Sequence, residues 1–368
     1  MTLASRLPVF PWDELAPAKT KAQAHPGGIV DLSIGTPVDP VPPVVRAALS
    51  AAADSPGYPQ VHGTAALRAA AAGWLARRHG VTVSPDSVLP VLGTKELVAS
   101  LPALLACGPG DRVVYPELAY PTYRIGALLA GAEPVAADGT VAAGPAPVRL
   151  AWVNSPSNPT GRVLPAGHLA KMVSWARERG AVLASDECYI GLGWEADAEP
   201  VSVLHPEVCG GSHDGLLAVH SLSKRSNLAG YRAGFVTGDP ALVAELLEIR
   251  KHSGMMPPAP VQAAMTAALN DDEHADEQRQ RYAARRTRLR PALEAAGWSV
   301  THSEAGLYLW AEHRAHDCWG SVHALAEAGI LVAPGEFYGP AGARHVRVAL
   351  TATDERIDAA VTRLAELA

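Results

Sequence analysis

The sequence has few cysteines, few aromatic residues and no long hydrophobic run. Four of its 368 residues are cysteine and no two form a CxxC pair, so we expect neither a disulfide framework nor a metal site. No uncharged apolar stretch reaches the ~18 residues of a membrane span, and the first residues lack the features of a secretory signal. A net charge of −6 gives no basic excess for nucleic acid. We therefore predict a cytoplasmic protein that binds neither nucleic acid nor membranes.

The middle of the chain alternates short apolar runs with helical patterns such as Ala166–Arg179 and Pro240–Lys251. Apolar strands that alternate with helices predict an α/β fold with a mostly parallel sheet buried on both faces. The predicted strands are Ser87–Leu92, Arg112–Tyr115, Val148–Asn154, Ala181–Ser185 and Leu216–Ser221.

The two ends of the chain differ from this middle part. Residues 1–43 are rich in proline and irregular, whereas a long charged helix is predicted at Glu277–Ala296. Short strands follow near Leu307–Ala311 and His345–Ala349, and a last helix begins after the N-cap Thr353. We predict a large α/β domain over residues 44–275 and a smaller α+β domain over 276–368, which residues 1–43 join.

Three predicted strands each end in polar residues. Ser221-Leu222-Ser223-Lys224 closes one strand, Asp186-Glu187-Cys188-Tyr189 follows another, and Asn158-Pro159-Thr160-Gly161 follows the third. Taken alone, the lysine is typical of a solvated surface group, and the other two segments are typical of turns or helix caps. Since parallel strands release their carboxyl ends at one edge of a sheet, the three together favour a common ligand there.

This ordered set, with Arg232 eight residues after Lys224, resembles the class I/II aminotransferases of pyridoxal-5′-phosphate (PLP) fold type I. The resemblance covers essentially the whole chain. It implies a large domain with a mostly parallel central sheet flanked by helices, plus a smaller α+β domain. It also implies PLP as the cofactor and the transfer of an amino group as the reaction.

The resemblance assigns a role to each of the polar residues. Lys224 corresponds to the lysine that forms the Schiff base with PLP and then moves a proton on the substrate. Asp186 corresponds to the partner of the pyridine nitrogen, which its charge keeps protonated. Asn158 and Tyr189 correspond to the hydrogen-bond partners of the phenolic oxygen.

The phosphate is expected at the turn Gly93-Thr94-Lys95, between a strand and the helical stretch Glu96–Ala106, because a helix N-terminus offers N–H donors to an anion. Ser221, Ser223 and Arg232 are its further expected partners. Tyr120 resembles the aromatic residue that stacks on the cofactor ring. Tyr58 resembles the tyrosine that reaches the phosphate of a neighbouring subunit, which implies a homodimer with shared active sites.

Arg347 resembles the arginine that binds the substrate α-carboxylate, which it can do through two hydrogen bonds. Without the resemblance it would be interpreted as a surface arginine on an alternating strand. Gly35 resembles the glycine whose backbone touches the same carboxylate, and Asn158 is also expected to contact the substrate.

Within the family, the sequence is most similar to actinobacterial-type N-succinyldiaminopimelate aminotransferases, which use glutamate in lysine and diaminopimelate biosynthesis. The implied reaction exchanges an amino group between glutamate and N-succinyl-2-amino-6-oxopimelate. Both of these substrates carry a carboxylate distant from the reacting carbon, so a second cation should line the pocket. Lys21, Arg225, Arg250 and Lys251 are equal candidates for this cation. The stretches that carry the similarity are Leu7–Trp12, Gly35–Pro40, His220–Arg232 and Gly335–Gly342.

Two other kinds of function stay open at this point. One is another PLP enzyme on the same fold, such as an aspartate- or aromatic-type aminotransferase or a carbon–sulfur β-lyase. The other is a ligand-sensing domain of a transcription regulator, which the sequence disfavours because no basic helix-turn-helix precedes the aminotransferase-like segment.

Overall fold

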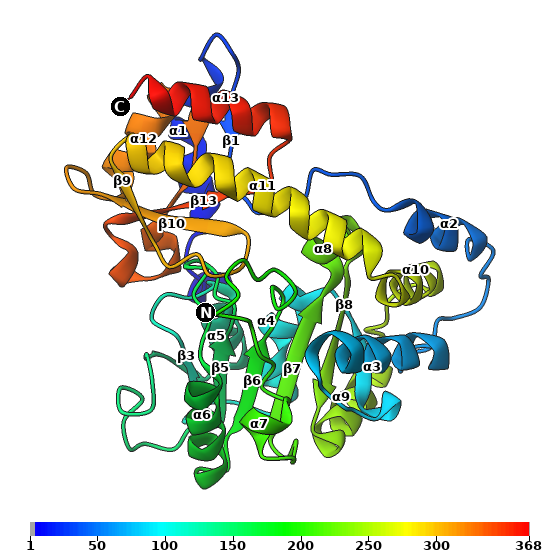
Figure 1. Cartoon of the computed structure of the whole chain (residues 1–368). Coiled ribbons are helices and arrows are strands. Elements are labelled where there is room, and N and C mark those ends of the chain that lie inside the picture. Colours follow the sequence, from blue (N-terminus) through cyan, green and yellow to red (C-terminus); the bar gives the residue numbers. More distant parts are fainter. Residues whose placement is uncertain (1–3, 368) are drawn as a thin grey trace.

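Seven strands form the central sheet of the computed structural model, which describes residues 4–367 (Figure 1). All of them run in one direction except β8, which is antiparallel to both of its neighbours. The predicted sheet of mostly parallel strands is therefore present. In spatial order the strands are β2 (Val88–Leu92), β8 (Ala233–Gly238), β7 (Leu216–Ser221), β6 (Val182–Asp186), β5 (Leu150–Asn154), β3 (Arg112–Tyr115) and β4 (Glu133–Ala136).

Both faces of this sheet are covered by helices, which explains why its inner strands are mostly apolar, whereas the edge strand β4 is not fully buried. In β5, Ala151 and Val153 point into one core, while Leu150 and Trp152 point into the other. The first core is closed by α3 (Ala65–His79), α6 (Ala166–Glu178) and α10 (Ala259–Asn270). The second is closed by α4 (Thr94–Leu104), α5 (Thr122–Ala130) and α9 (Pro240–Ser253).

The C-terminal part of the chain builds a second, antiparallel sheet with its own apolar core. Its strands, in spatial order, are β12 (Ala333–Pro334), β13 (His345–Ala349), β10 (Tyr308–His313) and β9 (Trp298–Thr301). The helices around it are α11 (Glu273–Ala295), α12 (Cys318–Glu327) and α13 (Asp354–Ala365).

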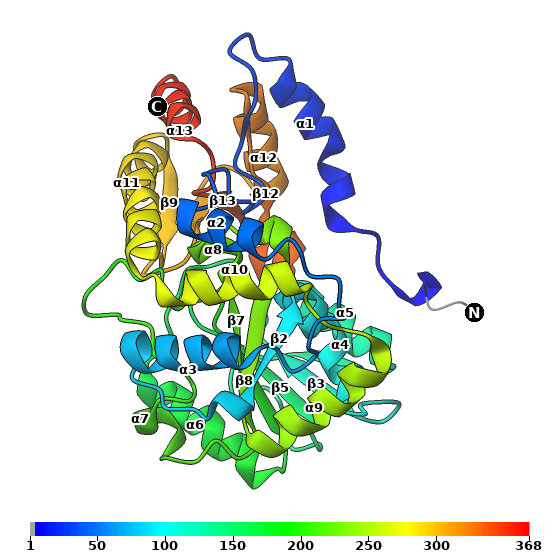
Figure 2. The same cartoon turned by 90° about the vertical axis from the view of Figure 1, so that its right-hand side faces the viewer.

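The N-terminal segment packs against this C-terminal part. Helix α1 (Ala16–Gln23) lies beside α12 (Figure 2), and Ala18 and Ala22 are buried in the same apolar core as Leu325. Strand β1 (Val30–Asp31) pairs in parallel with β11 (Ile330–Leu331). These contacts support the proposed association of the two ends, whereas the domain limits at residues 43 and 275 stay a prediction.

The remaining elements are short. They are η1 (Ala4–Arg6), η2 (Pro11–Leu15), α2 (Pro43–Ala51), η3 (Pro85–Ser87), α7 (Pro206–Cys209), α8 (Leu222–Arg225), η4 (Ala229–Tyr231), η5 (Gly335–Tyr338) and η6 (Pro340–Gly342). Across residues 4–367, no helix has the length and apolar character needed to cross a membrane.

The limits of several elements differ by a few residues from those predicted. Helix α11 begins at Glu273, four residues before the predicted start at Glu277, and continues through Pro291. Helix α4 begins at Thr94, directly after Gly93, and not at Glu96. The N-cap predicted at Thr353 is confirmed, because its side chain accepts a hydrogen bond from Arg356 N.

Candidate active site

The candidate site lies at one edge of the central sheet, where the carboxyl ends of β2, β5, β6 and β7 meet. Asp186 ends β6, and Lys224 follows β7 within the short helix α8. Arg232 reaches the same edge by a different route. It directly precedes β8, and because β8 is antiparallel to β7, its amino end lies where the other strands have their carboxyl ends. Ser221 pairs with Gly234, so Arg232 returns to the edge of the sheet at which Ser221 lies.

Gly93 connects β2 to α4 in a conformation that suits glycine, with φ +77°. A Cβ at this position would collide with Nη2 of Arg232, so the absence of a side chain lets the guanidinium lie against the turn. The first N–H groups of α4 have no partners within the helix and face a cation-lined edge. The turn and Arg232 could therefore hold an anion.

Hydroxyl groups lie around the same turn. Ser221 caps α8 by accepting a hydrogen bond from Ser223 N at 3.1 Å. The Cys188 thiol donates to Thr94 Oγ1 at 3.3 Å, which leaves the Thr94 hydroxyl proton available to a ligand. Lys95 is exposed, and its Nζ lies 5.6 Å from the centre of the Phe10 ring.

Lys224 is mostly buried and, within residues 4–367, has no acidic partner. Burial lowers the pKa of its amine; the nearby Tyr308 and Cys188 partly oppose this, and Arg347 and Arg232 add smaller decreases. A buried lysine with a lowered pKa more readily presents the neutral amine that acts as a nucleophile or base.

Asp186 is a buried carboxylate without a cationic partner among the residues described. It accepts hydrogen bonds from the Tyr123 hydroxyl at 2.8 Å and from Cys188 N at 3.2 Å. Burial raises its pKa, although these hydrogen bonds oppose the change. A cationic N–H group of a ligand would complete this site, since an isolated charge is costly to bury.

Arg347 lies on β13 of the smaller sheet and is buried, and its contacts include Asn158, which follows β5 of the larger sheet. Its Nη1 donates to Asn158 Oδ1 at 2.9 Å, and its Nη2 donates to the Ser33 carbonyl at 2.7 Å. Its guanidinium carbon lies 3.9 Å from the centre of the Tyr308 ring and 4.8 Å from that of Tyr338. Neither contact neutralises its charge, so Arg347 can still bind a carboxylate.

Tyr189 and Gly35 meet at Tyr308. The hydroxyl groups of Tyr189 and Tyr308 lie 3.2 Å apart, and burial raises the pKa of Tyr189 well above its usual range. A Cβ on Gly35 would collide with the Tyr308 hydroxyl, so glycine allows the backbone to approach here. Asn158, Tyr189, Gly35 and Arg347 therefore form one continuous group.

The two other tyrosines predicted for the site lie in different surroundings. The Tyr120 ring centre is 5.9 Å from that of Tyr123, and burial raises the pKa of Tyr120 to about 12. Tyr120 is thus near Asp186, which Tyr123 contacts. Tyr58 is 99% exposed and is not part of the buried group around Asp186 and Arg347.

The four cations considered for a distal carboxylate each have an acidic partner outside the candidate site. Arg250 is fully buried and binds Glu96 through two hydrogen bonds of 3.1 and 3.0 Å. Lys224 and Arg347, in contrast, have no acidic partner within residues 4–367 and are free to bind an anionic ligand. The pairs are Lys21–Glu327, Arg225–Asp272, Arg250–Glu96 and Lys251–Glu248.

Several residues of the site were not predicted from the sequence, namely Tyr123, Cys188, Tyr308 and Tyr338. Tyr123 lies one helical turn after Tyr120 on the first turn of α5, which was a usable signal. Tyr308 is the first residue of β10, next to the strand that carries Arg347. Only the pairing of those two strands shows that its side chain meets the guanidinium.

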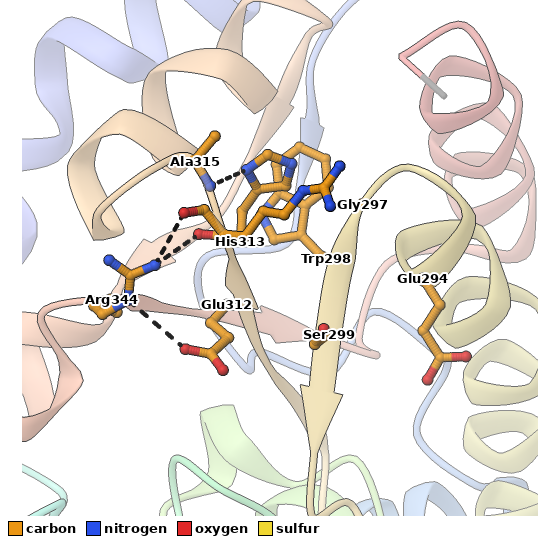
Figure 3. Close-up of a pocket in the computed structure, with 9 residues that line it drawn as sticks. Glu294, Gly297, Trp298, Ser299, Glu312, His313, Ala315 and Arg344 are labelled. Carbon is orange, nitrogen blue, oxygen red and sulfur yellow. Dashed lines mark hydrogen bonds and ion pairs between the residues drawn. The ribbon is translucent and has the colours of Figure 1, made fainter.

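A separate hollow of about 680 Å³ lies on the smaller sheet (Figure 3). Arg344 crosses it to donate to the carbonyls of His313 and Arg314, and it also approaches Glu312. None of the residues that line this hollow belongs to the candidate site, so its size alone does not make it the active site. Its lining is Glu294, Gly297, Trp298, Ser299, Glu312, His313, Arg314, Ala315 and Arg344.

Comparison with known proteins decides what this site belongs to. Residues 28–364 match the family model for aminotransferases of class I and II. The chain belongs to this family. A probable aminotransferase of Mycobacterium tuberculosis is 64% identical to this aminotransferase over 98% of the chain and 86% of the relative. The 4-dedimethylamino-4-oxo-anhydrotetracycline transaminase of Streptomyces rimosus is 62% identical over 97% of the chain and 99% of the relative.

Solved structures agree with this assignment. A probable N-succinyldiaminopimelate aminotransferase from Thermus thermophilus superposes with a TM-score of 0.86, at 29% identity, over 98% of this chain and all of the other. The aminotransferase therefore has PLP-dependent fold type I, and it is a PLP-dependent transaminase. The residues at the sheet edge fit PLP, which brings a protonatable ring nitrogen, an anionic phosphate and an aldehyde.

Proposed function

We propose that this aminotransferase exchanges an amino group between glutamate and N-succinyl-2-amino-6-oxopimelate, a step of lysine and diaminopimelate biosynthesis. The observation that carries the proposal is the set of cations without acidic partners around Lys224, within the described chain. Arg347 is suited to an α-carboxylate, and Lys95 remains for a more distant one. The likeness to a probable N-succinyldiaminopimelate aminotransferase supports the same substrate class.

Lys224 is the proposed attachment point of PLP and the proton carrier of the reaction. Bound PLP supplies an electron-accepting ring that stabilises the charge left on the substrate Cα when its proton is removed. With PLP bound, the free Lys224 amine would take the proton from the substrate Cα and deliver it to C4′ of PLP, the carbon on the other side of the amino nitrogen. The lowered pKa of Lys224 favours the neutral amine that this step needs.

Asp186 would hold the protonated ring nitrogen of PLP through its buried carboxylate, which the Tyr123 hydroxyl orients. A cationic partner lowers the pKa of a buried carboxyl, so binding would keep Asp186 ionised. Asn158 and Tyr189 would donate hydrogen bonds to the phenolic oxygen. Tyr189 would then leave Tyr308 for the cofactor or share its hydroxyl between the two.

The phosphate would be held by the first turn of α4 after Gly93, by the hydroxyls of Thr94, Ser221 and Ser223, and by Arg232. The ring of Tyr120 would stack on the cofactor. Tyr58 would reach the phosphate of a second subunit, which accounts for its complete exposure in a single chain. We accordingly propose a homodimer in which each subunit completes the other's site.

Lys95 is the proposed partner of the distal substrate carboxylate. It lies one residue after Thr94, and the partial loss of contact with water together with Arg232 lowers the pKa of its ammonium. An anionic group of the substrate would relieve this repulsion. The four cations considered from the sequence cannot take this role without leaving their carboxylate partners.

The substrate proposal is tested by a panel of acceptors, with purified PLP-loaded enzyme and glutamate as the donor. We expect kcat/KM to be highest for N-succinyl-2-amino-6-oxopimelate, compared with oxaloacetate and an aromatic keto acid. Lys95→Met should lower this preference, whereas Lys171→Met, an exposed lysine on α6, should not. Equal kcat/KM values across the panel would contradict the proposed substrate but leave the transaminase intact.

A second candidate substrate is a ring ketone, because the 62% identical relative is a 4-dedimethylamino-4-oxo-anhydrotetracycline transaminase. Such a substrate has no α-carboxylate to place on Arg347, so its turnover would depend on Arg347 only through the amino donor. Including it in the same panel separates the two proposals. A kcat/KM above that of every keto acid would assign the enzyme to the ring ketone.

A further inference from the structure

Arg347 and two residues near it each have a buried hydrogen-bond donor without a partner among the described residues. These donors are Nε of Arg347, the hydroxyl of Tyr338 and Nε1 of Trp12. Tyr338 is only 3% exposed, and Arg347 is equally buried. Buried donors without partners are uncommon in native proteins, and each one needs an explanation. A group of three in one place indicates a ligand that brings acceptors.

The side chains that carry the three donors are neighbours, with Tyr338 next to both Arg347 and Trp12. The Tyr338 ring centre is 4.8 Å from the guanidinium carbon of Arg347 and 6.4 Å from the ring centre of Trp12. Tyr338 is fixed in place because its carbonyl accepts a hydrogen bond from Ala119 N at 2.8 Å, beside Tyr120. The hydroxyl therefore belongs to the same region as the proposed substrate clamp.

Trp12 is held over this region by other aromatic rings. Its ring centre lies 5.4 Å from that of Phe337 and 5.5 Å from that of Phe10. Phe10 in turn lies under the ammonium of Lys95. The segment Phe10–Trp12 thus contacts Lys95 near the amino end of α4 through Phe10, and η5 through Trp12.

All three groups are available as hydrogen-bond donors. An indole N–H and a guanidinium N–H can only donate, and the Tyr338 hydroxyl has a proton to give. A substrate α-carboxylate has two oxygens, which the remaining N–H groups of Arg347 can bind. The donors of Tyr338 and Trp12 are left for a further oxygen of the same molecule.

We propose that the Tyr338 hydroxyl and the Trp12 indole N–H recognise an oxygen on the substrate side chain, beyond the α-carboxylate at Arg347. These two residues would make the enzyme prefer amino and keto acids with an acidic or acylated side chain over alkyl ones. This inference rests on the proposed function only in placing the α-carboxylate at Arg347. It does not depend on which acidic substrate is the natural one.

The test compares two unreactive acids of equal chain length, glutarate and pentanoate, by isothermal titration calorimetry on the PLP-loaded enzyme. Glutarate carries the second carboxylate and pentanoate lacks it. We expect Tyr338→Phe and Trp12→Phe each to weaken glutarate binding by about ten- to a hundredfold, the range of a hydrogen bond to a charged group. Pentanoate binding should stay the same. Trp175→Phe, which removes another unpartnered buried indole N–H on α6, is the matched control.

Each other outcome overturns the proposal. Equal weakening of both acids would place the donors on the common carboxylate, and no weakening would remove them from the site. Equal binding of glutarate and pentanoate by the wild-type enzyme would show that it has no preference for an acidic side chain. The binding of these two acids is measured without turnover. The binding result therefore does not depend on whether the N-succinyl substrate is preferred in the acceptor panel. Because the Tyr338 hydroxyl has no partner, Tyr338→Phe should have the thermal midpoint of the wild type. A lower midpoint would show that the hydroxyl has a structural role. The binding comparison would then be made with Trp12→Phe.

Discussion

Replacing Glu187 with glutamine should stabilise the folded protein at neutral and alkaline pH. Glu187 follows Asp186 directly and is 1% exposed. Its Oε1 accepts a hydrogen bond from Val203 N at 2.7 Å, and Oε2 lies 3.5 Å from Nε2 of His220; the hydroxyls of Ser202 and Ser185 near the carboxyl only partly oppose the effect of burial on its pKa. Burial lowers the pKa of His220 to about 3, so the imidazole is neutral at pH 7 and the contact is not an ion pair.

The expected size follows from the cost of ionising this carboxyl in a buried place. Burial raises the pKa of Glu187 from 4.5 to about 7, and at about 1.4 kcal/mol per pH unit the charged form costs the folded state about 3 kcal/mol. A raised pKa means that the folded state binds the extra proton. The stability that this proton provides is complete below about pH 4.5 and is lost as the pH rises through about 7. Glutamine keeps the acceptor for Val203 N and never ionises.

The assay is the thermal midpoint of wild type and Glu187→Gln between pH 5 and pH 8.5, each loaded with PLP. The two midpoints should be close at the acidic end, and the variant should be higher by about 3–6 °C at the alkaline end. Glu245→Gln, an exposed residue on α9, serves as the control and should show no such trend. A difference that stays constant with pH, or a variant less stable at pH 8.5, would refute the reasoning.

Three further outcomes test the site. Lys224→Ala should lose the visible absorbance of lysine-linked PLP, and persistent borohydride labelling of the chain would point to a different lysine. Arg347→Ala should raise KM by about a hundredfold for every amino donor, because all donors share the α-carboxylate; an effect limited to one donor would assign Arg347 to side-chain recognition. Gly93→Ala should weaken PLP binding at least about tenfold, since the added Cβ displaces Arg232 and φ is +77°; unchanged affinity in a PLP titration would contradict this role.

Most of the central sheet was predictable because burial on both faces leaves apolar runs in its inner strands, whereas the edge strand β4 was not predicted. Arg112–Tyr115 and Leu216–Ser221 are confirmed with the predicted limits. Strand β8 was not predicted. Its sequence, Ala233–Gly238, contains two glycines and a threonine, and an apolar run carries no information about the direction of its strand.

The site was predictable where a motif keeps its residues close in the chain, as in Ser221–Lys224. The environment of Arg347 was not, because it depends on contacts between distant segments. Ser33, Asn158 and Tyr308 reach Arg347 from three parts of the chain. The sequence shows these residues as an isolated serine, a turn asparagine and a strand tyrosine, and only the folded arrangement of these distant segments around β13 combines them.

The reversed direction of β8 has a consequence for how the length of the chain can vary. Residues 222–232 leave the sheet edge at the end of β7 and return to that edge at the start of β8, and the ladder between Ser221 and Gly234 closes the loop. Lys224 and Arg232 are therefore spaced by one short closed segment, and an inserted residue would displace one cation relative to the other. The loop of residues 137–147, which contains none of the residues of the candidate site, carries no such constraint. Differences in length among relatives should accumulate there and be absent from residues 222–232.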